Sequence, residues 1–434
     1  MKALFALLVL ALLVPAPGCP ASDSPLRILH FGDSHVASDS LTASARETLA
    51  GAFGDGGPGV MMPWATPKTF RRPGVAAGAT DGWRRHVPSS AGGLEDAGLS
   101  GCFIEAEGVG EEAWIRADAV VFRVAFLRQP GGGTIDFLVD GRLAGRESTA
   151  SAAPEASIAR FRADGGVAPH RLTIRAAGGG KVRLLGVSAE NGAPGVVYSP
   201  LGVVGARAES LLRIRPEIFD RLLAAESPDL VLLGFGTNEA ASAGFDPAAY
   251  ETTLARVVDR IRSAAPRAAV ILLTPPDRSD RQPATAARSR QALSQVVEIQ
   301  RIVAARAGLP LIDLFSLMGG AGTADRWRLA TPPLAQTDGT HFTKAGYAQL
   351  GRIVGRELLS LRAEDRVAWP PLTAKAPVPP PAAKRILYFV KPDGSLLLTD
   401  DPKRGVEEGG RPMSDAEFRK FVNAGLPEGE AETP

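Results

Sequence analysis

The sequence predicts an α/β protein whose parallel sheet is interrupted by an all-β insertion. Short apolar runs alternate with amphipathic helical segments in residues 26–53 and again after Pro200, a pattern typical of a parallel sheet covered by helices on both faces. Between these parts, residues 60–199 contain short, partly alternating runs separated by glycine-rich turns, which is typical of antiparallel sheets. We therefore expect a three-layer α/β/α domain that carries an inserted β-sandwich.

The first expected strand is residues 26–31 (LRILHF), which end at Gly32-Asp33-Ser34-His35. Asp39 is a candidate N-cap for a helix that continues to about Phe53, because apolar residues recur at helical spacing from Leu41 onward. The segment therefore predicts a strand, a tight turn and a helix.

The glycine-rich segment 55–59 is expected to end this pattern and to lead into the all-β insertion. Asp140-Gly141 and Gly178-Gly179-Gly180 are turn signals of the hairpin type. The expected strands of the insertion include 119–127, 134–139, 157–162, 171–175 and 181–187.

After Pro200, helices and strands alternate again. The expected helices are 216–225, 247–265, 285–307 and 343–361, and the expected strands are 230–235, 269–273 and 310–314. The last helix places its large apolar residues on one face, as a helix that covers a sheet does. These residues are Tyr347, Leu350, Val354, Leu358 and Leu361.

The chain begins with a segment typical of exported proteins. Lys2 precedes an apolar run from Ala3 to Val14, and small residues follow up to Cys19, as in a secretory signal. The run is shorter than the ~20 residues that span a bilayer. We expect export to the periplasm or cell envelope, and Gly18 before Cys19 leaves open a lipid anchor at Cys19 or a soluble product. If Cys19 is lipidated or removed, Cys102 has no partner for an internal disulfide.

The expected units are a signal segment (1–19), an α/β domain (25–59 and 200–363), the insertion (60–199), a proline-rich linker (364–384) and a small tail (385–434). Two apolar runs flank Lys391-Pro392-Asp393-Gly394 in the tail, which predicts a hairpin. Ser414 and Glu417 form a capping box for a short helix.

The composition argues against nucleic acid and metal partners. Lys and Arg (49) almost balance Asp and Glu (47), and they are scattered, so a basic nucleic-acid surface is not expected. Two cysteines cannot build a cysteine-rich metal site. His30, His86 and His170 lack ligand-type spacing and are expected to be structural. We expect neither a metal nor an organic cofactor.

Three groups of polar residues follow expected strands, where ligands bind in open parallel sheets. Ser34 lies on a turn at a helix start, where backbone N–H groups favour negative charge. Asn238 follows the strand 230–235 and can direct its side-chain N–H toward the same point. Asp338 and His341 precede the last helix, and their spacing lets the carboxylate orient the imidazole. A serine nucleophile needs such a base and orienter.

These residues lie in four ordered blocks that resemble those of the SGNH/GDSL hydrolase family. The blocks are Gly32-Asp33-Ser34, Gly205-Ala206-Arg207, Gly236-Thr237-Asn238 and Asp338-Gly339-Thr340-His341. The resemblance implies a flavodoxin-like parallel sheet in the α/β domain.

The resemblance also implies the role of each site residue. Ser34 would be the nucleophile, His341 the general base and Asp338 its partner. The backbone N–H groups of Ser34 and Gly205 and the side chain of Asn238 would form the oxyanion hole. Gly205 is preferred to Gly202 because Gly-Ala-Arg matches the family block.

His35 and Glu239 stand where many family members have Leu and Asp. Both residues and the insertion resemble the bacterial peptidoglycan O-acetylesterase branch, in which the insertion looks like a carbohydrate-binding jelly roll. This implies an exported serine esterase that removes O-acetyl groups from a cell-envelope polysaccharide, with peptidoglycan favoured. The alternatives are a lipolytic esterase or thioesterase, an O-acetyltransferase, and a glycan-binding envelope protein without activity.

Several other residues have two interpretations. We expect His35 to line the site and not to act as its base. Trp64, Trp83 and Trp114 are candidates for stacking on sugar rings, although core packing is favoured. The basic segments 68–72 (KTFRR) and Arg84-Arg85 are candidates for meeting an anionic polymer, with a solvated surface as the default.

Overall fold

The computed structural model describes most of the chain from residue 24 onward. The described residues are 24–61, 72, 74–87, 94–279, 283–369, 372, 387–390, 392, 396–399, 406, 409 and 411–412, with backbone only for 283–287, 387–390 and 396–399. The predicted signal segment with Cys19, Trp64, and the predicted helix at Ser414 and Glu417 lie outside these residues. So do Lys68 to Arg71 of the KTFRR segment and most of the proline-rich linker.

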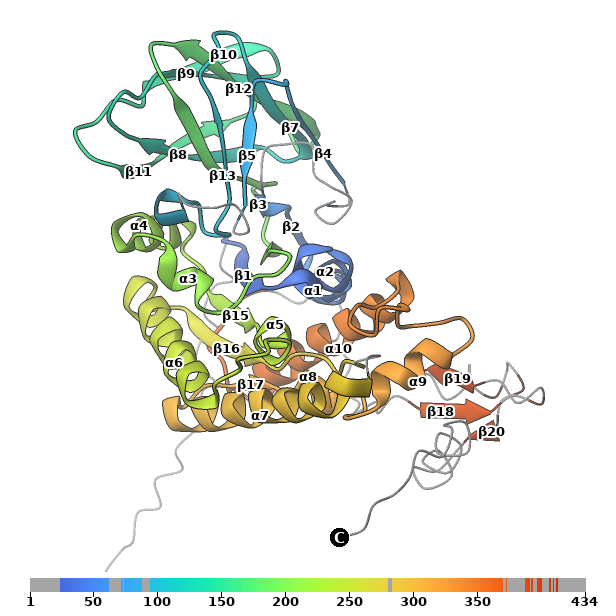
Figure 1. The fold of residues 1–434 in the computed structure, drawn as a ribbon. Helices are drawn as coiled ribbons and strands as arrows, with labels where there is room; N and C mark the ends of the chain where they lie inside the picture. Colours follow the sequence, from blue (N-terminus) through green and yellow to red (C-terminus); the bar gives the residue numbers. More distant parts are fainter. Residues whose placement is uncertain are drawn as a thin grey trace, which may run out of the picture.

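Six parallel strands form the sheet of the α/β domain, in the order β17-β16-β15-β1-β14-β2 (Figure 1). They are β1 (Leu26–Gly32), β2 (Asp55–Gly57), β14 (Val196–Gly202), β15 (Leu230–Gly234), β16 (Ala269–Leu273) and β17 (Leu311–Ile312). The predicted parallel α/β sheet is therefore confirmed. Segment 55–59, which was expected only to end the pattern, instead contains the edge strand β2. Strand β14 begins at Val196, ahead of the boundary expected after residue 199.

Helices cover both faces of the sheet. On one face α2 (Ser40–Phe53) packs against α10 (Lys344–Ala363), and their apolar residues form one buried cluster with Leu26 and Ile28 of β1. On the other face lie α4 (Pro216–Glu226), α6 (Pro247–Ala264) and α7 (Pro283–Ala307), whose apolar residues cluster with Leu29 and Phe31. Strand β1 therefore sends alternate side chains into two cores, as expected of a strand buried on both faces.

Shorter helices complete the α/β domain. They are α1 (Ser34–Ala37), α3 (Ser210–Arg213), α5 (Thr237–Ala240), α8 (Leu314–Leu317) and α9 (Thr323–Leu329). Asp39 is the N-cap residue of α2, but it adopts a left-handed φ of 50° and its side chain makes no capping bond. Its carboxylate instead accepts a hydrogen bond of 2.5 Å from the Thr42 hydroxyl. None of the described helices has the length and apolar character needed to cross a bilayer.

The inserted domain consists of two antiparallel sheets at one end of the molecule (Figure 1). One has the order β10-β9-β12-β7-β4, and the other has the order β11-β8-β13-β6-β5, with β3 also paired to β13. The strands are β3 (Gly59–Met61), β4 (Val75–Ala79), β5 (Arg84–His86), β6 (Phe103–Ala106), β7 (Glu112–Asp118), β8 (Val121–Arg128), β9 (Thr134–Val139), β10 (Arg142–Ser148), β11 (Glu155–Arg162), β12 (Pro169–Gly178) and β13 (Val182–Glu190). The predicted all-β insertion is confirmed.

The insertion and the α/β domain share one apolar core. Phe122 and Phe126, inside the sandwich, belong to the same buried cluster as Leu29 and Phe31 of β1. Strand β3, which leaves the α/β domain, pairs with β13 of the sandwich through Ser188 and Val60. Burial of apolar surface therefore holds the two domains together, in addition to the two chain crossings.

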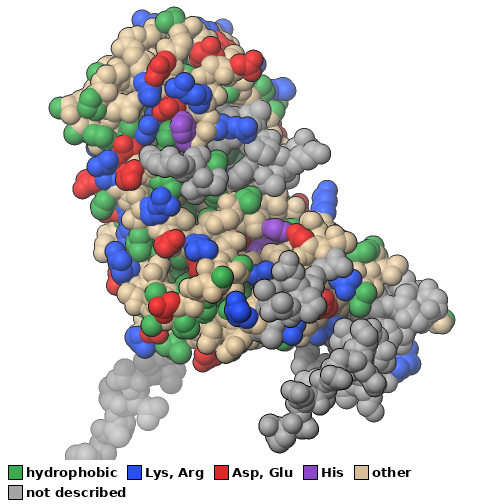
Figure 2. All heavy atoms as spheres, viewed as in Figure 1, with side chains coloured by type: hydrophobic (Ala, Val, Ile, Leu, Met, Phe, Trp, Pro, Cys, Tyr) green, Lys and Arg blue, Asp and Glu red, His purple; other side chains and the backbone are tan. Residues whose placement is uncertain are grey.

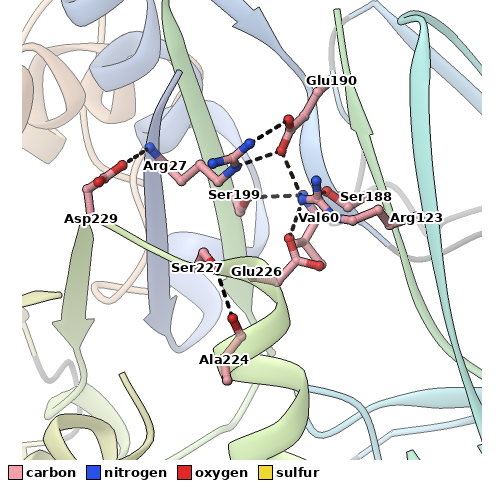
Figure 3. A network of polar contacts seen from close by, with 10 residues as sticks. All are labelled: Arg27, Val60, Arg123, Ser188, Glu190, Ser199, Ala224, Glu226, Ser227 and Asp229. Carbon is pink, nitrogen blue, oxygen red and sulfur yellow. Dashed lines mark hydrogen bonds and ion pairs between the residues drawn. The ribbon is translucent and has the colours of Figure 1, made fainter. Parts of the chain in front are cut away.

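A buried network of charges also joins the two domains (Figure 3). Glu190 of β13 accepts hydrogen bonds of 2.9 and 3.0 Å from Arg27 of β1, and another of 2.9 Å from Arg123 of β8. Arg123 also donates to Glu226 of α4 over 2.7 Å. Burial disfavours the Glu190 carboxylate, but the hydrogen bonds and charges of the two arginines outweigh burial and lower the pKa of Glu190 to about 2.

This network predicts that Glu190→Gln destabilises the protein. We expect a loss of about 3 kcal/mol in unfolding free energy at pH 7, because two arginines lose their shared carboxylate. Since the folded pKa lies below the ordinary value, the contribution is complete above pH 4.5 and disappears as the pH falls toward 2. Urea unfolding at pH 7 and pH 3 measures both effects.

Glu147→Gln provides the matched control. Glu147 pairs with Arg128 at 3.0 Å, but its side chain is 42% exposed, and exposed pairs contribute less than ~1 kcal/mol. Equal effects of the two substitutions at pH 7 would contradict the importance assigned to the buried network.

The described part of the tail forms a small antiparallel sheet. It contains β18 (Leu387–Val390), β19 (Leu396–Thr399) and β20 (Arg411–Pro412), in the order β19-β18-β20. The two longer strands form the predicted hairpin, because Val390 pairs with Leu396 and Leu387 with Thr399.

Candidate active site

Three glycines bring the ends of the central strands close to the segment that carries Ser34. β1, β14 and β15 end at Gly32, Gly202 and Gly234, and Gly32 is in register with both of the others. A Cβ on Gly32 would lie 2.4 Å from a Val36 methyl carbon, and one on Gly202 would lie 2.3 Å from the Ala37 nitrogen. Only residues without a side chain let α1 fold back this tightly over the sheet.

The residue before the serine fixes the start of α1. Asp33 is buried, and its Oδ1 accepts a 2.9 Å hydrogen bond from the His35 backbone N–H as the N-cap of the helix. The Ser34 N–H lies in the first turn, and no described residue accepts a hydrogen bond from it. A donor without an internal partner remains at the nucleophile, where negative charge develops during ester cleavage.

Ser34, His341 and Asp338 form one hydrogen-bonded row. Ser34 Oγ lies 2.8 Å from His341 Nε2. His341 Nδ1 lies 2.6 Å from Asp338 Oδ2. In Figure 2, histidine side chains on the surface of the α/β domain lie beside an acidic side chain. The geometry is that of a nucleophile, a base within hydrogen-bond reach and a group that orients the base.

The loop before α10 holds the Asp338 carboxylate in its ionised form. Burial disfavours the charge, but the His341 backbone N–H, the His341 ring and the Thr340 N–H all donate to the carboxylate, and together they lower the pKa of Asp338. The loop is anchored at Gly339, whose carbonyl accepts a 2.7 Å hydrogen bond from Ser279 N–H. A carboxylate fixed in this way keeps the Nδ1 proton on the imidazole and leaves Nε2 to accept the serine proton.

Asn238 and Gly205 lie on the two segments that are expected to complete the oxyanion hole. Asn238, in α5, donates one side-chain N–H to the Ala206 carbonyl over 2.8 Å, which leaves its second amide hydrogen available. Gly205 is exposed with a φ of 78°, and no described residue accepts a hydrogen bond from its N–H. Both groups therefore retain a donor for a ligand, and their catalytic roles, like those of the other site residues, remain predictions.

His35 lies behind the His341 ring. Its Nδ1 is 3.0 Å from the Tyr347 hydroxyl, and its ring centroid is 5.6 Å from that of His341. Burial lowers the pKa of His35, which keeps the imidazole neutral. The sequence placed Tyr347 only on the apolar face of the last helix, and no sequence signal indicated its hydrogen bond to His35.

The remaining histidines have structural contacts. His30 is fully buried and lies 2.8 Å from the Tyr198 hydroxyl, and burial lowers its pKa to about 3. His86 stacks on Phe103 at 4.4 Å, and His170 pairs with Asp140 at 2.6 Å. No cluster in the described part of the chain has three or more side chains of the kind that hold a metal ion.

The tryptophan and arginine residues singled out in the insertion differ in their burial and in their contacts. Trp83 is buried as expected, whereas Trp114 is half-buried with Arg171 stacked 4.4 Å above its ring. Arg84 and Arg85 are exposed, in agreement with a solvated surface. Arg72 differs from that expectation because its guanidinium donates to the backbone carbonyls of Val60 and Tyr198.

The fold and the site together define an α/β serine hydrolase, and comparison with protein families agrees. Residues 168–349 match the GDSL-like lipase/acylhydrolase family, from β12 of the insertion through most of the second part of the α/β domain. The matched segment is therefore a domain of this type, and the chain is an ester hydrolase. The block with Ser34 lies outside the matched residues, and β1 brings it into the same sheet. No curated protein sequence matched the chain.

One solved structure of similar fold supports the same assignment, and others show weaker likeness. A structure described as a peptidoglycan O-acetylesterase in action is 25% identical, with a TM-score of 0.66, and the match covers 79% of this chain and 93% of that one. An acetylxylan esterase from Geobacillus stearothermophilus is 21% identical, with a TM-score of 0.30, over 38% of this chain and 73% of its own. A family two carbohydrate esterase from Clostridium thermocellum, in complex with cellohexaose, is 13% identical, with a TM-score of 0.25. The match covers 61% of this chain and 95% of that one.

The Asp338–His341 contact predicts a large effect of Asp338→Asn on turnover. An amide at this position favours the wrong imidazole tautomer, so kcat should fall by about 10⁴ while KM changes little. Steady-state hydrolysis of a small acetyl ester measures both constants. Asp259→Asn, at an exposed carboxylate on α6, is the control and should match the unmodified protein. A kcat within tenfold for Asp338→Asn would exclude the proposed role.

Proposed function

We propose that the protein is an exported serine esterase that removes O-acetyl groups from a cell-envelope polysaccharide, with peptidoglycan as the favoured substrate. The observation that carries this proposal is the hydrogen-bonded row of Ser34, His341 and Asp338, in which the Ser34 backbone N–H has no acceptor among the described residues. A nucleophile, a base and free donors at one point are what ester cleavage requires.

The reaction proceeds through an acyl-enzyme. Ser34 Oγ attacks the acetyl carbonyl carbon while His341 Nε2 takes the hydroxyl proton, and Asp338 stabilises the imidazolium that forms. The carbonyl oxygen, now negative, accepts hydrogen bonds from the N–H groups of Ser34 and Gly205 and from Asn238. His341 returns the proton to the departing sugar oxygen. A water molecule, deprotonated by His341, then attacks the acyl carbon. The bond between this carbon and Ser34 Oγ breaks, His341 returns the proton to Oγ, and acetate leaves.

Two observations support the choice of substrate. The chain is similar to a solved peptidoglycan O-acetylesterase structure, and the inserted β domain is part of that similarity. The peptidoglycan O-acetylesterase structure matches 79% of the chain, a share larger than the α/β domain alone. The apolar core and the Arg27–Glu190–Arg123 network attach the inserted domain firmly beside the esterase sheet. A polymeric substrate can contact both domains at once, whereas a small ester needs only the α/β domain.

The proposal of export is supported by the signal-like segment 1–19. An acetylated cell-wall glycan is found outside the cytoplasm, so such an enzyme must cross the membrane to reach it. Cys19 is the residue that a lipid anchor would use.

Acetate release from acetylated polymers tests the proposal. The unmodified protein and Ser34→Ala are incubated side by side with acetylated peptidoglycan and with acetylated xylan. We expect acetate release from peptidoglycan by the unmodified protein, and a fall of at least 10³-fold for Ser34→Ala because the nucleophile is lost. Thermal unfolding should show the same midpoint for both proteins.

Other outcomes would change the conclusion. Acetate release from xylan alone would keep the mechanism and replace the substrate. Cleavage of a small ester without release from either polymer would favour a lipolytic esterase, a thioesterase or an O-acetyltransferase. Full activity of Ser34→Ala would exclude Ser34 as the nucleophile. Binding of the glycan without any hydrolysis would favour a glycan-binding envelope protein.

A further inference from the structure

The tip of the loop that carries Gly205 is exposed, whereas the residues on both sides of the tip are packed. Val204 is 48% exposed and Gly205 is also exposed, but Ala206 and Ala208 are buried. A hollow of about 160 Å³ lies beside the loop, and Arg207 helps to line it. Because no side chain covers the exposed tip, hydrogen bonds to the residues that flank it help to determine where the Gly205 N–H points.

Glu239 supplies one of these hydrogen bonds and also joins the loop to α5. Its Oε1 accepts a 2.8 Å bond from the Ala208 N–H in the loop, and its Oε2 accepts a 3.1 Å bond from the Gly236 N–H at the start of α5. The side chain is nearly buried, with the residue 8% exposed. The neighbouring Asn238 bonds to the Ala206 carbonyl in the same loop.

We propose that Glu239 is a positioning residue of the oxyanion hole. Its carboxylate spans the two loops, and so sets the distance between the Gly205 N–H on one side and the Asn238 amide on the other. The inference rests on the function proposed above. It also gives a physical reason for glutamate at a position where many members of the family have aspartate, because the longer side chain reaches both N–H groups.

The carboxylate form is the one suited to this role. An ionised carboxylate accepts hydrogen bonds through both oxygens, whereas glutamine would direct an NH₂ group at one of the two N–H donors. Asp33, Arg207 and Tyr250 are the titratable side chains that face Glu239 from the described neighbouring elements. Burial, and to a smaller extent the charge of Asp33, raise the pKa of Glu239. The backbone N–H bonds and Arg207 lower it, but burial outweighs them and the pKa is about 7.

The test compares Glu239→Gln, Glu239→Asp and the unmodified protein. The first readout is kcat and KM for p-nitrophenyl acetate. The second is the affinity for phenylboronic acid, whose boron takes up a serine oxygen and forms a tetrahedral anion like the transition state. For Glu239→Gln we expect kcat to fall by about 10- to 100-fold with KM changed less than threefold, because donors in an oxyanion hole act on the transition state. The affinity for the boronic acid should fall by a similar factor.

Two controls separate this role from a general structural one. Glu209→Gln changes an exposed glutamate in the same loop whose side chain makes no described hydrogen bond, and it should leave kcat and boronic acid affinity unchanged. The ratio of kcat between the unmodified protein and Glu239→Gln should rise as the pH increases from 6 to 8, because only the unmodified protein gains the carboxylate.

Each outcome has a definite meaning. A kcat and boronic acid affinity within twofold of the unmodified protein for Glu239→Gln would overturn the inference, as would a lower melting temperature with unchanged kinetics. If Glu239→Gln does not fold, Glu239→Asp decides by the same criteria, because it keeps the charge and shortens the side chain. Loss of activity in Ser34→Ala together with normal Glu239 variants would overturn this inference alone. Full activity in Ser34→Ala would overturn the proposed function.

Discussion

The close approach of three strand ends is the constraint on which the site depends. Gly32, Gly202 and Gly234 lie side by side at the carboxyl edge of the sheet, and α1 folds back over Gly32 and Gly202 so closely that neither position has room for a Cβ atom. A side chain at Gly32 or Gly202 would push α1 away from the sheet. Ser34 would then move relative to His341, which is anchored separately by α10 and the Gly339–Ser279 contact. Backbone packing at the sheet edge therefore sets the 2.8 Å distance between nucleophile and base.

The inserted domain is part of the same folded unit as the sheet that it interrupts. The apolar cluster that contains Phe31 of β1 continues into the sandwich, and the Glu190 carboxylate connects arginines of both domains. Such an interface resists hinge motion, since opening it would expose apolar surface and leave buried charges without partners. The surface of the insertion is thus held in a constant orientation relative to Ser34, which suits recognition of a long substrate.

The sequence predicted the main elements because their patterns were strong, and it missed those whose patterns were weak. The strand 269–273 has the expected bounds and the helix that begins at Pro247 ends within one residue of the expected position, since apolar runs and caps mark them clearly. The edge strand β2 has only three residues, two of which are glycine, and β14 contains Pro200 directly after an all-β region. Neither shows the features of a buried strand. Ser34, Asn238, Asp338 and His341 could be singled out because each lies in a family block, and Ser34 and Asn238 also come soon after a strand. The hydrogen bond between Glu239 and Ala208 and the one between Tyr347 and His35 could not be found in the sequence, because each joins residues far apart in the chain.

The order of the chain determines when the protein becomes chemically competent. Ser34 and His341 are separated by 307 positions, and the whole sandwich is synthesised between them. A growing polypeptide carries Ser34 from the beginning but lacks Asp338 and His341 until the segment that ends in α10 has been made and has docked against α2. A chain that ends before Asp338 therefore cannot form the hydrogen-bonded row. The row exists only in molecules that have been synthesised and folded through α10.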